Sequence, residues 1–319
     1  MTEYGFDRRH ECPACTSRNT EQVYSSPLGE PPVSDYLRDF YAPQGGVEFD
    51  YLKGADLILD ECLDCGLIYQ RLVPNQQLAK LLYEKWIDPS KAFQLYHLNK
   101  GIDYYAELAA EIAMVIRFFG RNPNELTCLD FGMGWGDWCK MAQAHGCEAQ
   151  GVELCRDQIE YAKRFGVGVI DHSDIAHCEF DFINTEQVFE HIADPLLTLK
   201  YLCRALKSLG IIKISVPNGL DIKRRLRKMD WTAPKDSYYS LNPVSPLEHV
   251  NCFNHHSLLN MARAAGLVQI NISPNVNKRL LDWTLKEILR PYYRRLNRLR
   301  PVGRAGSTCL FFTHEKRGR

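Results

Sequence analysis

Strand-like and helix-like segments alternate through residues 125–275, and this alternation constrains the fold more than any other feature. Short apolar stretches such as LTCLDFG, EAQGVEL and IIKISVPN are separated by amphipathic ones such as WGDWCKMAQAHG and HHSLLNMARAAG. Strands connected through helices run parallel, and the helices then cover both faces of the sheet. The sequence therefore predicts an α/β fold with a doubly wound, Rossmann-like, mostly parallel sheet. The segment STCLFFTHE is expected to add the last strand in antiparallel orientation.

Capping residues predict where the helices begin and end. Gly146 and Gly166 follow two of the predicted helices, in the position where glycine commonly ends a helix. The segment DPLLTLKYLCRALKSLG is predicted to form one helix, with Asp194 as the N-cap, Pro195 in the first turn and Gly210 at the end.

The composition is that of an ordinary globular protein. Hydrophobic residues make up 45% of the 319-residue chain, and the formal net charge is zero. Without bulk positive charge the chain is not expected to bind DNA, and RNA is disfavoured. The chain has no apolar run of the roughly 18 residues that a membrane span needs. Its first residues lack the apolar stretch of a secretory signal, so a cytoplasmic location is expected.

Four of the twelve cysteines form two matched pairs, Cys12/Cys15 and Cys62/Cys65, each with two residues between the thiols. Four thiolates in this C-x2-C pattern suit tetrahedral Zn²⁺, and a site with four protein ligands has a structural role. Disulfides and plain core cysteines are the alternatives, and a reducing compartment disfavours disulfides. The other eight cysteines are interpreted as small core residues.

These patterns divide the chain into five parts. We expect a zinc-ribbon-like segment at 1–75, a helical linker or cover at 76–120 and the ligand-binding α/β core at 121–275. A basic helical insertion at 276–305 is followed by the last strand and tail at 306–319. The basic insertion could bind phosphates or a membrane surface, or it could be an amphipathic helix with one solvated face.

The stretch LDFGMGWGDW places an aspartate, Asp130, before three alternating glycines, Gly132, Gly134 and Gly136. A dinucleotide-binding fingerprint needs a glycine at the sixth position, where this chain has Asp or Cys. A phosphate loop needs Gly-Lys-Ser/Thr, which does not follow here. Glycines after a strand let a ligand approach the backbone at the carboxyl edge of the sheet. The alternative is a tight turn that binds no ligand.

This motif resembles the first motif of class I S-adenosylmethionine-dependent methyltransferases. FDFINTEQVFEHIADP and EHVNCFNHHSLLNMARAAGL resemble segments of the ubiquinone-biosynthesis-like and sugar methyltransferase branch, and LDECLDCGLIYQ resembles a zinc-binding segment found in that branch. The resemblance implies S-adenosyl-L-methionine as the methyl donor. The cofactor-binding residues that it implies are Asp130, Gly132, Gly134 and Gly136 at the amino-acid part, Glu153 at the ribose, Asp174 at the adenine, and Gln187.

Methyl transfer to an oxygen, nitrogen or activated carbon requires alignment of the acceptor atom with the methyl group, and generally a base that removes a proton from the acceptor. The resemblance places Glu190 and His191 on the substrate side. His191 is the candidate base because an imidazole titrates near neutral pH, and Glu190 either orients it or is itself the base. His249 is the other candidate base. Alternatively, His191 caps the helix that follows.

Three functional classes are left open by the sequence. The first is a methyltransferase that acts by in-line displacement on a small molecule or a saccharide, with an anionic acceptor such as a nucleotide- or lipid-linked sugar. The second is an RNA or protein methyltransferase that uses the zinc segment for recognition, although acidic residues around the cysteines disfavour RNA. The third is a non-catalytic binding module, which the intact glycine motif and Glu-His pair argue against.

Overall fold

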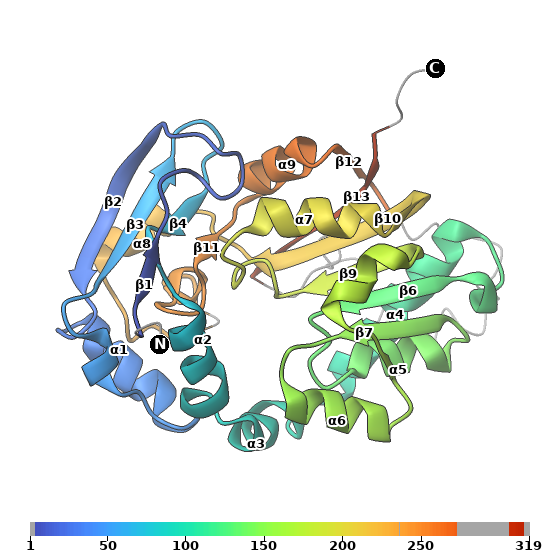
Figure 1. Cartoon of the computed structure of the whole chain (residues 1–319), viewed down its shortest axis with the longest axis horizontal. Coiled ribbons are helices and arrows are strands. Elements are labelled where there is room, and N and C mark those ends of the chain that lie inside the picture. Colours follow the sequence, from blue (N-terminus) through green and yellow to red (C-terminus); the bar gives the residue numbers. More distant parts are fainter. Residues whose placement is uncertain (1–3, 236, 273–305, 316–319) are drawn as a thin grey trace, which may run out of the picture.

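A seven-stranded sheet forms the centre of the larger half of the molecule. The computed structural model describes residues 4–235, 237–272 and 306–315. The strand order is β12-β13-β10-β9-β6-β7-β8 (Figure 1). The strands are β6 (Thr127–Phe131), β7 (Glu148–Val152), β8 (Gly168–Val169), β9 (Phe180–Glu186), β10 (Leu206–Pro217), β12 (Leu267–Ile270) and β13 (Ser307–His314). Neighbours from β8 to β10 pair in parallel, whereas β13 is antiparallel to β10 and β12, which confirms the predicted fold class.

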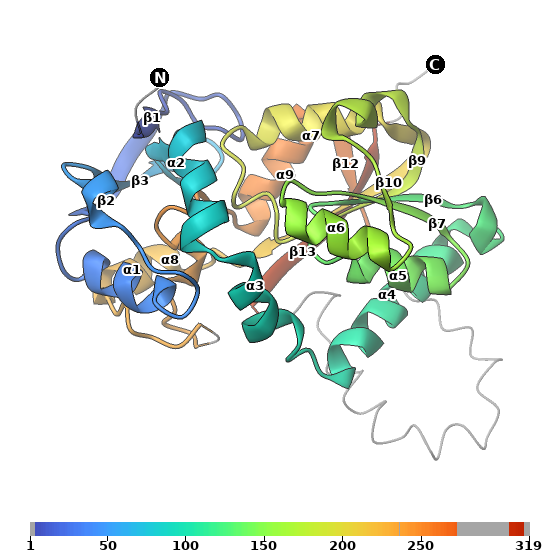
Figure 2. The same cartoon turned by 60° about the horizontal axis from the view of Figure 1, so that its bottom comes forward.

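Helices cover both faces of this sheet. On one side lie α4 (Ile102–Phe119), α5 (Asp137–Ala144) and α6 (Arg156–Arg164), and on the other lie α7 (Pro195–Arg204) and α9 (His255–Ala264) (Figure 2). α4 ends at Gly120, which adopts the left-handed conformation with a φ of 62°. A glycine there has no Cβ to oppose this conformation, and its amide satisfies a carbonyl of the last helical turn.

The helix predicted between Asp194 and Gly210 is shorter than expected. α7 ends at Arg204 and β10 begins at Leu206, so Gly210 lies inside a strand. The pairing of β10 with β9 shifts register between Leu206 and Ile211, and a Cβ at Gly210 would lie 2.8 Å from Leu206 Cδ1. The glycine therefore permits an irregular strand and does not end a helix. Asp194 occupies the N-cap position, but its side chain makes no cap hydrogen bond with the described residues.

Residues 4–100 contribute to a four-stranded sheet, form the separate two-stranded sheet β1-β5 and add flanking helices. The elements of this half are β1 (Phe6–Arg8), β2 (Thr20–Pro27), α1 (Val33–Tyr41), β3 (Asp56–Cys62), β4 (Ile68–Gln70), β5 (Leu72–Pro74), α2 (Gln76–Leu81) and α3 (Pro89–Ala92). The four-stranded order is β11-β4-β3-β2, and the edge strand β11 (Asn251–Cys252) comes from the larger half, as does α8 (Ile222–Lys228). Strands from both halves therefore complete one sheet.

The hydrophobic core also continues across the two halves. One cluster joins Leu67 and Tyr69 of the smaller half to Phe189, Leu199 and Phe253 of the larger half. Burial of this shared apolar surface holds the halves together. The division into five parts stays a prediction, and the basic segment 276–305 lies outside the described residues. Among the described helices, none has both the length and the apolar character to cross a bilayer.

Candidate active site

The glycine loop connects β6 to α5, and its three glycines have positive φ angles of 76°, 54° and 76°. A Cβ at Gly132 would lie 2.6 Å from Val188 Cγ2, and a Cβ at Gly136 would lie 3.1 Å from Ala162 Cβ. At Gly134, by contrast, such an atom would have no described neighbour within 4 Å. Two of the glycines therefore let the loop pack closely, while Gly134 leaves an open face that a ligand could approach.

Asp130 lies beneath this loop, with 3% of the residue exposed. Its Oδ1 accepts a 2.7 Å hydrogen bond from Asn184 Nδ2 on the adjacent strand β9. Burial raises the pKa of Asp130 to about 7, and the bond from Asn184 opposes this shift. The carboxyl group therefore links β6 to β9 next to the start of the glycine loop. Its contact with the ammonium group of S-adenosylmethionine stays a prediction.

Glu153 follows β7 and holds the loop from its other side. Its Oε2 accepts a 3.0 Å hydrogen bond from Gly134 N, and its Oε1 accepts bonds from the amides of Leu154 and Cys155. These bonds place the carboxylate beside the open face, where the sequence predicts the ribose. Asp174, predicted at the adenine, lies on an exposed 3₁₀ turn, His172–His177, which follows β8.

The turn after β9 contains Glu190 and His191, the residues predicted to face the substrate, and it packs against the glycine loop. Gln187 adopts a φ of 56°, which is uncommon for a residue with a side chain, and its amide donates to Ser215 O at 2.8 Å. Strained backbone of this kind is often found at functional sites. The next residue, Val188, is the neighbour that requires a glycine at Gly132. The Glu-His pair that follows therefore lies near the predicted donor site.

Glu190 and His191 form a compact cluster with two residues from distant segments. Glu190 is 1% exposed, and both of its carboxylate oxygens are without a hydrogen-bond partner among the described residues. His191 Nε2 lies 3.9 Å from Glu190 Oε1, and its Nδ1 lies 3.2 Å from the Tyr83 hydroxyl. The His249 ring meets the His191 ring edge-on at 4.8 Å between centroids, and its Nδ1 is bonded to Asn242 O. Both imidazoles are oriented through Nδ1, so Nε2 is the atom available to a ligand.

The electrostatics of this cluster favour neutral groups. Burial raises the pKa of Glu190 well above its usual range and lowers the pKa of His191 to about 4. Lys235 also lowers the pKa of His191 and of His249, and a neutral imidazole is the form that accepts a proton. One carboxylate oxygen of Glu190 and one ring nitrogen each of His191 and His249 lie within 4.8 Å of one another. These three atoms could therefore also bind a divalent cation. The sequence did not predict this second use of the cluster.

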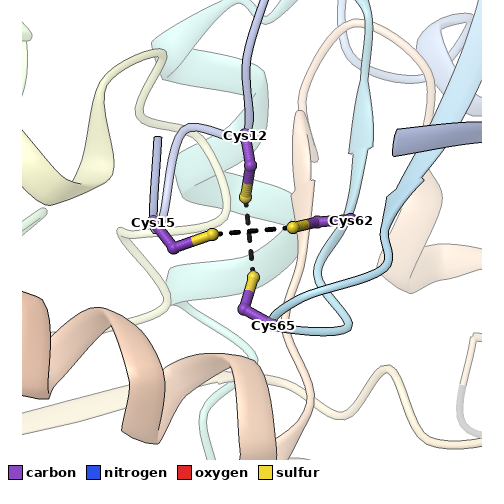
Figure 3. Close-up of side chains that lie close together, drawn as sticks. All are labelled: Cys12, Cys15, Cys62 and Cys65. Carbon is purple, nitrogen blue, oxygen red and sulfur yellow. Dashed lines mark hydrogen bonds between the residues drawn. The ribbon is translucent and has the colours of Figure 1, made fainter. Parts of the chain in front are cut away.

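The four paired cysteines converge on one point (Figure 3). Cys12 Sγ lies 3.5 Å from Cys65 Sγ, and Cys15 Sγ lies 3.5 Å from Cys62 Sγ. A disulfide would need an S–S distance of about 2.05 Å. Two thiolates on one tetrahedral zinc are about 3.8 Å apart when the Zn–S distance is ~2.3 Å. The arrangement therefore fits Zn²⁺ with protein ligands at all four positions, which is the character of a structural site.

Two residues at the site were missed by the sequence analysis. Asn184 is a fully buried polar residue of β9, but Asp181 and Thr185 of the same strand are also polar and buried, so the sequence pattern did not single out the residue that binds Asp130. Tyr83 lies in a π-helical turn, Leu82–Trp86, and nothing in its local pattern predicts contact with a residue 108 positions away.

Comparison with known proteins supports the same family. Residues 103–271, slightly more than half of the chain, match the methyltransferase domain family. The ubiquinone biosynthesis O-methyltransferase of Bartonella quintana (strain Toulouse) is 26% identical over an alignment of 204 residues, and the match covers 57% of this chain and 80% of that protein. The Idiomarina loihiensis protein of the same name is 25% identical over an alignment of 238 residues, and the match covers 68% of this chain and 90% of that protein.

Among solved structures, the plantazolicin methyltransferase BamL, in complex with a triazolic desmethylPZN analog and SAH, shares the fold. It has 14% sequence identity and a TM-score of 0.50, covering 75% of this chain and 94% of that chain. With a family match over residues 103–271, this chain belongs to the methyltransferase domain family and is, as its sequence predicts, an S-adenosylmethionine-dependent methyltransferase.

Proposed function

We propose that this enzyme transfers the methyl group of S-adenosylmethionine to a hydroxyl oxygen of a small molecule, with His191 as the base. The observation that carries the proposal is the close packing of the glycine loop against the turn that carries His191. Val188 of this turn packs against Gly132, and His191 follows three residues later. The names of the curated relatives, which are O-methyltransferases, support oxygen as the acceptor atom.

The donor in this proposal lies along the glycine loop. The open face at Gly134 admits its amino-acid part, and the Glu153 carboxylate beside that face accepts hydrogen bonds from the ribose hydroxyls. Asp130 contacts the ammonium group of the donor, and Asp174 contacts its adenine. Gln187 lies between the donor and the acceptor.

The acceptor hydroxyl lies beside His191 Nε2. As the new O–C bond forms, the C–S bond breaks, and the electron pair of that bond remains on sulfur. Nε2 takes the hydroxyl proton, so one positive charge leaves the sulfonium and one appears on the imidazole. The Nδ1 contact with Tyr83 fixes the tautomer, and the uncharged Glu190 carboxyl group, whose Oε1 lies 3.9 Å from Nε2, offers the imidazolium a dipole and not a full negative charge.

The charge near this cluster bears on the class of acceptor. Lys235 acts electrostatically on Glu190, His191, Glu248 and His249. An exposed cation near these groups favours an anionic molecule, and we place phosphate-bearing saccharides and small hydroxylated acids first. The four cysteines hold Zn²⁺ in a structural role in this proposal.

The test is a turnover assay with purified protein, donor and a panel of nucleotide sugars, lipid-linked sugars and hydroxylated aromatic acids, with the gain of one methylene detected by mass. We expect His191→Asn to lower kcat by about 100-fold or more, the usual contribution of a general base. Donor affinity, measured by isothermal titration, should stay unchanged. His255→Asn, at an exposed position on α9, is the matched control. Turnover of His191→Asn close to that of the wild type would exclude His191 as the base, and activity that requires added Mn²⁺ would assign the cluster to a metal.

A further inference from the structure

Arg9 connects the cysteine knuckle, the segment from Cys12 to Cys15, to the loop that carries Glu190 and His191. It precedes Cys12 by three residues and lies just after β1. Its guanidinium group donates hydrogen bonds to five oxygen atoms, which belong to Gln70, Val250, Asn251, Ile192 and Ala193. An arginine has five N–H donors in a rigid plane, so one side chain can fix several carbonyl groups at once.

Asn251 continues this connection into the turn itself. Its side-chain amide donates to Phe189 O at 2.9 Å and to Ile192 O at 2.7 Å, while its backbone amide donates to Glu190 O at 3.0 Å. Its own Oδ1 accepts a 3.0 Å bond from Arg9. Arg9 and Asn251 together therefore bind the carbonyl groups on both sides of His191.

The residues from Gln187 to Asp194 belong to no helix or strand, so no regular ladder fixes their backbone. The carbonyl groups of the buried residues Phe189 and Glu190 need partners, and Asn251, from a distant segment, supplies them. The knuckle adds a further contact, because Leu196 N at the start of α7 donates to Pro13 O. Pro13 lies between the predicted zinc ligands Cys12 and Cys15.

We infer that Arg9 is a positioning residue that transmits the geometry of the cysteine knuckle to Glu190 and His191. The inference rests on the proposed function of that pair. Arg9 does not touch the reacting atoms in this account; it holds the backbone from which the base projects. Misplacement of a base by about 1 Å is enough to lower a rate by roughly 100-fold.

The experiment compares Arg9→Met, Arg9→Lys and Arg71→Met in the 319-residue, metal-loaded protein. Arg71 is the matched control because its side chain pairs with Asp60 and makes none of the bonds to the turn, while its backbone carbonyl, which accepts from Arg9 N, is kept in the variant. We expect Arg9→Met to lower kcat by about 10- to 100-fold with donor Kd and zinc content unchanged. Arg9→Lys should retain an intermediate kcat, because an ammonium group can still bind some of the carbonyls. Arg71→Met should lower Tm but leave kcat within about twofold of the wild type.

A second measurement does not depend on turnover. The imidazole ¹⁵N signals of His191, assigned by their loss in His191→Asn, should shift in Arg9→Met and stay in place in Arg71→Met. Unchanged kcat and unchanged His191 signals in Arg9→Met would overturn the inference, as would equal losses of kcat in Arg9→Met and Arg71→Met. Failure of the proposed function is distinguishable, because it appears as normal turnover in His191→Asn whatever the Arg9 variants do.

Discussion

Gly132, Gly134 and Gly136 share a left-handed backbone, but the missing side chain serves a different purpose at each position. At Gly132 and Gly136 it allows contact with Val188 and with α6, so these two glycines hold the loop in place. At Gly134 the space is open, and the Glu153 carboxylate binds the amide of the same residue. Packing and ligand access are therefore separable by substitution.

Gly134→Ala should weaken donor binding more than it weakens the fold. The left-handed backbone is expected to lower stability by about 1–2 kcal/mol, and the new methyl group occupies the open face, so donor affinity should fall roughly tenfold or more. Gly132→Ala should lose more stability, because its Cβ would also lie 2.6 Å from Val188 Cγ2. Thermal unfolding and isothermal titration measure the two effects. Equal donor affinity in Gly134→Ala and the wild type would contradict the assignment of the open face.

Glu248 gives a prediction about pH. Burial raises its pKa to about 7, while the hydrogen bond from the Tyr41 hydroxyl opposes this shift. A carboxyl group whose pKa is raised in the folded state binds more protons there than in the unfolded chain. Its contribution to stability is therefore present at low pH and is lost as the pH rises through 7. Glu248→Gln removes this loss and keeps an acceptor for Tyr41.

The Tm of Glu248→Gln, relative to the wild type, should therefore increase between pH 5 and pH 8. We expect a relative gain of about 1 kcal/mol, or roughly 3 °C. Glu148→Gln, at an exposed position at the start of β7, is the control and should show no such trend. A constant difference in Tm across this pH range would show that folding does not raise the pKa of Glu248.

At the scale of elements, the two cysteine pairs lie at connections between strands of the N-terminal half. The first lies in the loop between β1 and β2, and the second lies in the turn between β3 and β4. Their side chains are buried in the cluster that contains Phe189 and Phe253. A metal bound by all four thiolates would link the two loops and secure the contact with α7.

Cys62→Ser should reduce the zinc content and lower the stability of the whole protein. Loss of a structural zinc is expected to lower the free energy of unfolding by about 3 kcal/mol or more, which corresponds to roughly 10 °C in Tm. Cys203→Ser, on α7 and away from the four-cysteine cluster, should leave the zinc content unchanged. Elemental analysis and thermal unfolding provide the measurements. Protein purified without any bound metal, yet as stable as the metal-loaded form, would rule out this structural role.

At the scale of the whole molecule, the methyltransferase sheet and the N-terminal half are not independent units. β11 pairs with β4 across the boundary, one hydrophobic cluster includes residues of both halves, and Tyr83 reaches His191 from the N-terminal side. The proposed acceptor site is therefore built from both halves, which predicts that neither half forms it alone.

A fragment of residues 101–319 should lack cooperative unfolding near the wild-type Tm, because removal of residues 1–100 exposes the shared apolar cluster. Coexpression of 1–100 with 101–319 should restore a complex that unfolds cooperatively and binds the donor. Size-exclusion chromatography, thermal unfolding and donor titration test both statements. A fragment that is monomeric, as stable as the full chain and fully competent in donor binding would disprove the dependence.

The alternation of strands and helices, the glycine loop and the C-x2-C pairs were predictable because each depends on residues close together in the sequence. Periodicity and short spacings determine which face of a strand is buried, where a turn forms and which thiols share a loop. Gly210 shows the limit of this reasoning, because its role comes from the register between β9 and β10 and not from its neighbours in the chain.

Only the tertiary structure decided which side chains surround His191. Tyr83 comes from 108 residues before it, His249 comes from a loop after β10, and Arg9 binds Ile192 from 183 residues away. No local pattern encodes such distances, because these contacts form only when the N-terminal half packs on the sheet and buries the shared cluster. The sequence by itself determined the reaction family and the donor loop, and the packing of distant segments decided the surroundings of the proposed base.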